Sequence, residues 1–172
     1  AIAVAGGGII FYMTGIRLAF HTVLFSLPLS VNLSVSGDSQ VMFPSELLVT
    51  ALGVSVIIYW LRNGTEFSEW IRHPITLAAT GYLFFLFISV LYSEMLTVSI
   101  KSMIVKCIYI TSFYGGAFLY FRNHEADKNF IIYYLFSLIL IIIIVLVRHS
   151  DFSFSKDVSG FVTKPFFQDH TI

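Results

Sequence analysis

The feature that most constrains the fold is an uncharged apolar run near the carboxyl end, Asn129–Val147 (NFIIYYLFSLILIIIIVLV). Its nineteen residues lie between Lys128 and Arg148. A helix rises about 1.5 Å per residue, so the run is about 28 Å long, close to the thickness of the hydrocarbon core of a bilayer. Because the run has no polar face to turn towards water, we expect a helix that crosses a membrane.

The composition agrees with a membrane protein. Hydrophobic residues make up 57% of the chain, charged residues 12%, and the mean hydropathy is +0.85. Soluble domains carry roughly 25% charged residues. The ten basic and ten acidic side chains balance, so no basic excess indicates nucleic acid as a partner. The single cysteine, Cys107, excludes a disulfide within the chain and a cysteine-based metal site, and we expect it to pack as a small hydrophobic side chain.

Five further apolar segments precede this run. The first, Ala1–Met13, is too short to span a bilayer, and we expect part of a helix there. We expect membrane spans in the other four, Ile16–Leu33, Phe43–Leu61, Ile75–Tyr92 and Ile100–Phe121. Polar connections separate the segments, at Val35–Gln40, Arg62–Pro74, Ser93–Ser99 and Arg122–Lys128. The pattern predicts an all-α fold, a polytopic transmembrane helical bundle of about five spans in this fragment, the first truncated.

The same pattern predicts two regions. Residues 1–149 form the transmembrane helical region, and residues 150–172 form an extracytoplasmic segment that leads to a further helix. Ala1–Met13 resembles the end of an interrupted helix, and Thr171-Ile172 stands where a new element could begin. We therefore expect these 172 residues to be a piece of a longer polytopic protein.

Local signals refine the predicted spans. Pro44, Ser45 and Glu46 are typical of a helix start, because proline is tolerated in the first turn and acidic charge complements the positive helix end. Pro28 interrupts a predicted span, which neighbouring helices can accommodate. Trp70 is amphipathic and suits the membrane interface. The pair Gly115-Gly116 favours close helix packing.

The distribution of basic residues predicts the orientation in the membrane. The loops on one side hold five of them, Arg17, Arg62, Arg72, Arg122 and Lys128. The short connections on the other side, Val35–Gln40 and Ser93–Ser99, hold none. We therefore expect the basic set to be cytoplasmic and the tail that follows Arg148 to lie outside the cytoplasm.

Ionisable side chains within predicted spans are costly, so each is a candidate functional residue. Lys101 lies one residue into its predicted helix, where a lysine side chain can extend to the interface. Lys106 lies roughly 8 Å deeper, and we expect it to face protein or a water-filled cavity, with Glu94 or an anionic ligand as its partner. Arg17 and His21 share one helical face. Either they contact a phosphate, or the arginine lies at the interface and the histidine packs against a neighbouring helix.

The densest cluster of polar and aromatic side chains is in the tail, at Phe161–Ile172 (FVTKPFFQDHTI). Lys164, Gln168, Asp169 and His170 form the only close group of acid–base or phosphate-binding side chains predicted outside the cytoplasm. The alternative is an amphipathic lead-in to another helix, with Asp169 or Thr171 as its N-cap. The sequence has no metal-ligand spacing, no glycine-rich phosphate loop and no nucleophile–base motif. We therefore expect no metal and no other cofactor.

A series of short motifs is distributed over nearly the whole chain. In order they are Leu27-Pro28-Leu29-Ser30, Pro44-Ser45-Glu46, Leu61-Arg62-Asn63-Gly64, His73-Pro74, Tyr92-Ser93, Ser99-Ile100-Lys101 and Pro165-Phe166-Phe167-Gln168-Asp169-His170-Thr171. Their order and spacing resemble the amino-terminal half of the O-antigen ligase and O-antigen polymerase family of bacterial membrane proteins. Each motif is short, and the resemblance depends on the series.

The resemblance implies a multi-helix glycosyltransferase of the bacterial inner membrane. Such proteins take a glycan from a polyprenyl diphosphate donor at the periplasmic face. Ligases transfer the glycan to the lipid A core, and polymerases add it to a growing polysaccharide. The family needs neither a metal nor a nucleotide, because the polyprenyl diphosphate is itself the leaving group. The partners implied are therefore the lipid bilayer, the lipid-linked glycan and the lipid A core or polysaccharide acceptor.

The chain also departs from the family pattern. The basic residues that hold the diphosphate and the histidine thought to act as base lie mostly in the later half of the family fold, so this part should be inactive alone. Where the family often has an arginine, this chain has Lys164. We take Lys164, His170, Lys106 and Lys101 as candidate substrate-binding residues and assign no catalytic residue.

Two other classes of function remain open. One is a transporter or channel in which Lys106, Arg17 and His21 line a solute path. Inverted repeats are typical of transporters, and the sequence has no detectable repeat. The other is a non-enzymatic membrane scaffold.

Overall fold

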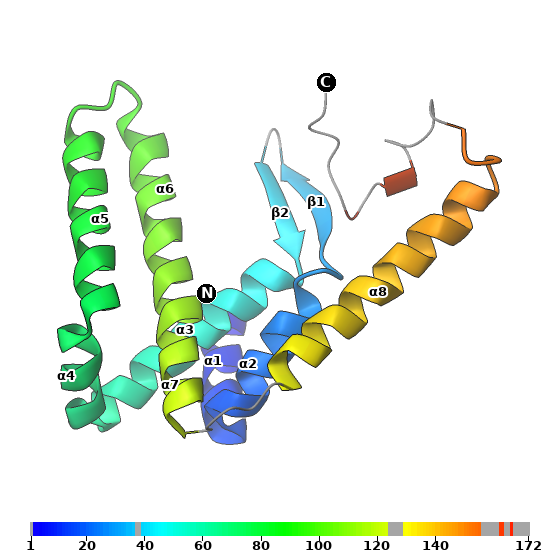
Figure 1. Cartoon of the computed structure of the whole chain (residues 1–172). Coiled ribbons are helices and arrows are strands. Elements are labelled where there is room, and N and C mark those ends of the chain that lie inside the picture. The colour runs from blue at the N-terminus through cyan, green and yellow to red at the C-terminus, as the bar shows by residue number, and fades with distance from the viewer. Residues whose placement is uncertain (1, 37–38, 124–128, 156–161, 164–165, 167–172) are drawn as a thin grey trace. The chain divides into compact units, whose positions relative to one another are not determined.

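The structure is a computed structural model of the whole chain (Figure 1), and it describes residues 2–36, 39–123, 129–155, 162–163 and 166. The chain divides into two compact units. One comprises Ala1–Phe20 and Val49–Glu125, and the other comprises His21–Leu48 and Ala126–Ile172. In the described part, the regular structure is helical apart from one two-stranded hairpin. The predicted all-α class is confirmed.

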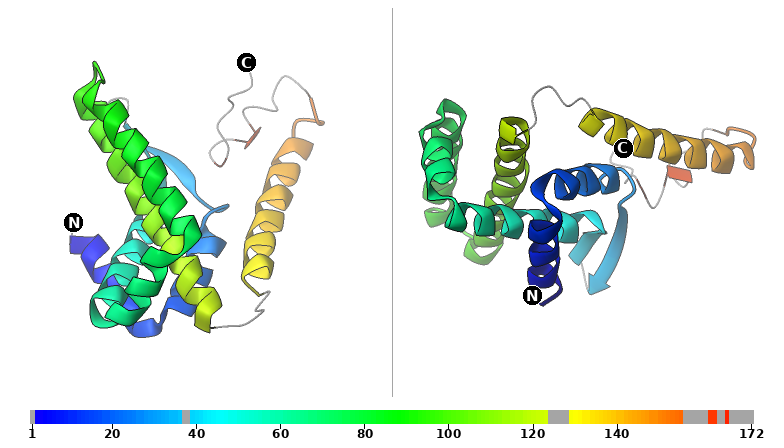
Figure 2. Two further views of the ribbon diagram at one scale, coloured as in Figure 1. Left: turned by 60° about the vertical axis from the view of Figure 1, so that its left-hand side comes forward. Right: turned by 90° about the horizontal axis from the view of Figure 1, so that it is seen from below.

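The first unit is entirely helical in its described residues. It contains α1 (Ile2–Thr14), the start of α2 (Ile16–Ser26), most of α3 (Ser45–Arg62), α4 (Gly64–Arg72), α5 (Pro74–Leu91), α6 (Leu96–Tyr109), the π-helical segment η1 (Ile110–Gly115) and α7 (Gly116–Asn123). The segments α6, η1 and α7 continue one another, and α5 and α6 lie side by side as a helical hairpin (Figures 1 and 2). Short α4 connects the end of α3 to the start of α5.

Four helices are long and apolar enough to cross a membrane. They are Ser45–Arg62, Pro74–Leu91, Leu96–Arg122 and Phe130–Ser150, the last within α8 (Asn129–Ser150). They match the spans predicted at Phe43–Leu61, Ile75–Tyr92, Ile100–Phe121 and Asn129–Val147. The first begins at Ser45, directly after Pro44 and with Glu46 in its first turn, as the sequence predicts.

These helices differ in how much of their surface the chain itself covers. In Ser45–Arg62, 44% of an 18-residue apolar stretch is buried within the chain, whereas the corresponding share is 11% in Pro74–Leu91 and 6% in Leu96–Arg122. The exposed side chains on α5 include Phe84, at 61%, and Phe85, at 72%. An apolar surface this extensive is typical of helices that contact lipid or other helices.

The predicted span at Ile16–Leu33 is wrong. Helix α2 ends at Ser26 after 11 residues, a length of about 16 Å. A turn around Pro28 follows, and β1 (Val31–Ser36) then pairs antiparallel with β2 (Ser39–Phe43). Proline cannot donate the backbone hydrogen bond that continues a helix, and the alternation of apolar and polar residues from Val31 to Ser36 has the period of a strand. The expected polar loop at Val35–Gln40 falls mainly on this hairpin.

The connection predicted at Arg62–Pro74 is a helix. Within α4, Phe67, Trp70 and Ile71 are spaced three and four residues apart, so they lie on one face of an amphipathic helix. The ring of Trp70 packs against that of Trp60 on α3, with 4.3 Å between the centroids. The tryptophan expected at the membrane interface therefore also fixes α4 against α3.

The core of the first unit lies where α3 meets η1 and α7. Val49, Leu52, Val56, Leu119 and Tyr120 are all buried there. The hydroxyl oxygen of Ser112 in η1 lies 2.8 Å from the carbonyl oxygens of both Val49 and Ile108, so the two carbonyls share its one hydrogen. The close packing predicted from Gly115-Gly116 is confirmed, since a Cβ on Gly115 would lie 2.8 Å from Cη2 of Trp60.

In the second unit, residues of α2 pack against α8. His21 is 8% exposed, and its ring lies 4.7 Å from that of Tyr133, measured between centroids. Phe25 and Phe136 stack one turn further on, at 6.4 Å. The simpler interpretation of His21, a histidine packed on a neighbouring helix, is confirmed. Arg17, four residues before His21, is exposed.

Candidate functional site

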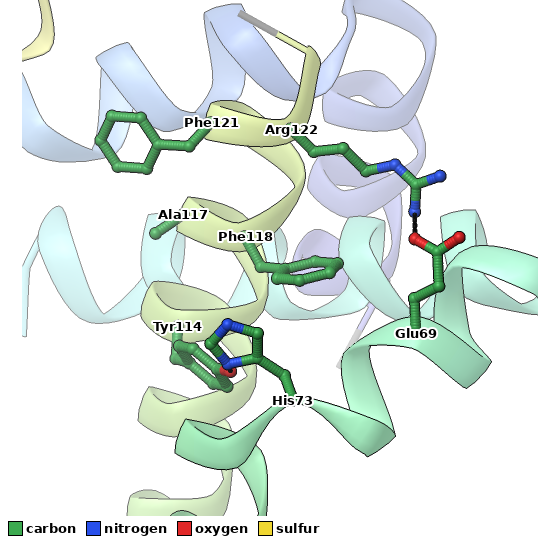
Figure 3. Close-up of a pocket in the computed structure, with 7 residues that line it drawn as sticks. All are labelled: Glu69, His73, Tyr114, Ala117, Phe118, Phe121 and Arg122. Carbon is green, nitrogen blue, oxygen red and sulfur yellow. Dashed lines mark hydrogen bonds and ion pairs between the residues drawn. The ribbon is translucent and has the colours of Figure 1, made fainter. Parts of the chain in front are cut away.

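A cavity of about 520 Å³ lies at the corner between α4 and α5, against the helix formed by η1 and α7 (Figure 3). Its lining residues are Glu69, His73, Tyr114, Ala117, Phe118, Phe121 and Arg122. The charged side chains of Glu69 and Arg122 lie together on one side, and the imidazole of His73 lies beside Tyr114 (Figure 3).

The dipeptide His73-Pro74 makes this corner. Pro74 occupies the first turn of α5, where its missing N–H is not needed, and it holds the preceding residue in an extended conformation. His73 accordingly has φ −68° and ψ 135°, while its backbone N–H bonds to the carbonyl of Trp70 and ends α4. The chain therefore turns sharply at His73 and directs the imidazole towards Tyr114.

A chain of hydrogen bonds fixes the corner to η1. The Thr76 hydroxyl donates to the carbonyl oxygen of Trp70 at 2.5 Å. The Thr76 hydroxyl also lies 2.8 Å from the Tyr114 hydroxyl, at hydrogen-bond distance. The Tyr114 hydroxyl also lies 3.0 Å from Nδ1 of His73, and the Ile75 amide donates to the same nitrogen at 3.4 Å.

An ion pair closes the other side of the cavity. Nη1 of Arg122 contacts Oε2 of Glu69, and the two side chains are 34% and 59% exposed. Ion pairs this accessible contribute about 0–1 kcal/mol to stability. The pair therefore positions one positive and one negative group at the cavity without holding the fold together.

Aromatic packing connects the cavity to α3. The Trp70 ring contacts Trp60, Phe67 and Tyr114, with centroids 4.3, 6.0 and 5.8 Å away. A second cavity of about 340 Å³ lies on this cluster; its lining residues are Ile57, Trp60, Leu61, Phe67, Trp70 and Thr111. Both indole Nε1 atoms, of Trp60 and Trp70, are buried without a hydrogen-bond partner among the described residues.

The structure does not test the predicted site residues as a group. Lys164 and His170 lie outside the described residues, as do Gln168 and Asp169. The lysines of α6 lie within the described part, and neither of them lines either of these two cavities.

The expected position of Lys101, one residue into its helix, is wrong. Helix α6 begins at Leu96, because Leu96, Val98 and Ile100 extend the apolar segment towards the amino end. Lys101 is exposed, and Lys106, about 15 Å from the helix start by helix rise, is half-buried. Among the described residues Lys106 forms no ion pair with Glu94, which removes one of the two partners considered and leaves the anionic ligand untested.

The residues that line the cavity were missed as a group by sequence reasoning. His73 and Tyr114 are 41 positions apart, and Glu69 and Arg122 are 53 apart. His73-Pro74 was recognised as a motif, but nothing in the sequence shows which side chain meets the imidazole. In the part of the chain that the structure describes, no group of three His, Cys, Asp or Glu side chains could hold a metal ion.

Comparison of the chain with models of known protein families, with curated proteins and with solved structures finds no match.

Replacing Tyr114 with phenylalanine should lower the free energy of unfolding by about 1–2 kcal/mol, because the Thr76 hydroxyl and the His73 imidazole both lose a partner. The matched control is Tyr92→Phe, since Tyr92 is 85% exposed. Thermal unfolding of the detergent-solubilised full-length protein measures the difference. Equal midpoints for the two variants would show that the hydrogen-bond chain does not stabilise the corner.

Proposed function

We propose that the chain is part of a bacterial inner-membrane glycosyltransferase of the O-antigen ligase and polymerase type. The observation that carries this proposal is the ordered series of motifs, several of which coincide with helix ends. Pro44-Ser45-Glu46 stands at the start of α3, His73-Pro74 at the start of α5, and Tyr92-Ser93 directly after its end. Four helices that can cross a membrane support the same class.

The proposed reaction breaks the bond between the anomeric carbon of the glycan and the diphosphate oxygen. An acceptor hydroxyl forms the new glycosidic bond and gives its proton to a base, while the polyprenyl diphosphate departs with the bonding electrons. Negative charge grows on the diphosphate, so positioned cations stabilise the transition state. Lys164 lies on the predicted extracytoplasmic side, where the family often has an arginine, and offers a point charge without the bidentate geometry of arginine. His170, Lys106 and Lys101 are further candidate contacts to the donor, and the remaining groups would come from the rest of the longer protein.

Genetic complementation tests the proposal. Deleting the gene in its host should remove the glycan ladder from lipopolysaccharide or the corresponding polysaccharide, and the full-length gene should restore it. Lys164→Ala should reduce the ladder about tenfold or more, as loss of a charge that acts on the transition state does, whereas Lys164→Arg should keep it. The matched control is Lys156→Ala, which removes the same charge from the same segment. A deletion strain with unchanged surface glycans would contradict the function.

A second candidate function is a membrane transporter. It is favoured by Lys106, a half-buried cation well inside the 27-residue helix Leu96–Arg122. Intramembrane cations commonly lie on ion or substrate paths. Solute uptake by proteoliposomes, abolished in Lys106→Met, would support this function over glycan transfer.

A further inference from the structure

The cavity at the α4–α5 corner lies at the end of two antiparallel helices that can cross a membrane. Pro74–Leu91 begins at this corner, and Leu96–Arg122 ends there (Figure 1). An 18-residue helix is about 27 Å long, so its ends lie close to the lipid headgroups on either side of the hydrocarbon core. Amphipathic α4, with Trp70 on its apolar face, is typical of a segment that lies along this interface.

The cavity combines opposite charges with an apolar wall. Ala117, Phe118 and Phe121 come from α7, the same helix that carries Arg122 (Figure 3). Glu69 comes from α4 and brings the only negative charge among the residues that line the cavity. A ligand that carries both a negative and a positive group next to an apolar part therefore complements this lining.

The ion pair leaves binding capacity on both partners. It joins Nη1 of Arg122 to Oε2 of Glu69, and within the described structure the other guanidinium N–H groups and Oε1 are unused. Guanidinium groups bind phosphate oxygens through several parallel hydrogen bonds, and a carboxylate oxygen accepts from an ammonium group. A zwitterionic ligand can bind both groups without breaking the pair.

We propose that this cavity binds the headgroup of a phosphoethanolamine lipid from the adjoining leaflet. The phosphate lies on Arg122, the ammonium group on Glu69, and the glycerol end of the acyl chains on Phe118 and Phe121. Phosphatidylglycerol has a phosphate but no amine, so its charge adds to an ion pair that is already neutral and leaves the site with one net negative charge. The site therefore selects the zwitterionic lipid over the anionic one.

Native mass spectrometry of the full-length protein in detergent tests the proposal. Titrations with phosphatidylethanolamine and phosphatidylglycerol of identical acyl chains give the two affinities. The unaltered protein should bind phosphatidylethanolamine about tenfold more tightly than phosphatidylglycerol, the difference that one net charge produces near a surface. Glu69→Gln should remove this preference, and Arg122→Gln should lower the affinity for both lipids about tenfold. The matched control, Arg72→Gln, removes an exposed charge from the end of α4, outside the cavity, and should change neither affinity.

Two results would overturn the proposal. One is equal affinity of the unaltered protein for the two lipids, a comparison that needs no variant and so is independent of any folding defect. The other is an Arg72→Gln effect as large as that of Arg122→Gln, which would indicate general surface charge. Soluble phosphoethanolamine at millimolar concentration should not displace the lipid, because it lacks the chains that contact Phe118 and Phe121. Displacement would show that the site takes the free headgroup rather than the lipid.

Discussion

Replacing Trp60 with alanine should lower the free energy of unfolding by about 3–5 kcal/mol, the cost of deleting a large buried aromatic side chain. Trp60 is 7% exposed and lies at the end of α3. Its ring contacts Phe67 and Trp70 on α4, at 5.5 and 4.3 Å between centroids, and it packs against the backbone of Gly115 in η1. One side chain therefore joins three helical segments.

The matched control for Trp60 is Phe85→Ala on α5. Phe85 is 72% exposed, so its loss removes little packing within the chain. Unfolding of the full-length protein in mixed micelles, followed by far-ultraviolet circular dichroism, compares the two variants without relying on tryptophan fluorescence. Equal destabilisation by both substitutions would contradict the packing of α3 against α4 and η1.

A methyl group at Gly53 should produce the second large effect. A Cβ on Gly53 would lie 2.6 Å from the hydroxyl oxygen of Ser112, which bonds the carbonyl of Val49. Gly53→Ala must displace that hydroxyl, so the variant loses the hydrogen bond and strains the contact between α3 and η1. Overpacking of this kind costs about 1–3 kcal/mol.

A second substitution separates this clash from any other effect of alanine. The same Cβ would lie 3.8 Å from Cβ of Ser112, an ordinary contact. Ser112→Ala should therefore remove the clash, and Gly53→Ala combined with Ser112→Ala should be no less stable than Ser112→Ala alone. Gly81→Ala, where nothing lies within 4 Å, is the matched control and should be neutral or stabilising. If Gly53→Ala behaves like Gly81→Ala, then α3 does not approach η1 as closely as the structure has it.

The four long helices could be predicted from the sequence because their signal is local. An uninterrupted apolar segment such as Asn129–Val147 has few conformations that satisfy its backbone in a membrane. The hairpin was missed for the opposite reason. Residues Ile16–Leu33 are apolar enough to suggest a span. The alternation from Val31 onwards has the period of a strand, but the strand forms there because it pairs with Ser39–Phe43.

The candidate site depended on contacts that the sequence does not encode locally. His73-Pro74 predicts a helix start, but the hydrogen bond between His73 and Tyr114 requires the start of α5 to pack against η1. The same holds for the ion pair of Glu69 with Arg122, in which each residue alone resembles a solvated charge. The tail cluster that contains Lys164 and His170 lies outside the described residues, so its role stays a prediction.

Reconstituted glycan transfer tests the proposed function most directly. The full-length protein in liposomes would receive a polyprenyl diphosphate-linked glycan and a lipid A core or polysaccharide acceptor, with a chelator present and no nucleotide. We expect the glycan to appear on the acceptor together with released polyprenyl diphosphate. Absence of transfer by folded protein, with solute uptake in the same liposomes, would contradict the glycosyltransferase and favour a transporter.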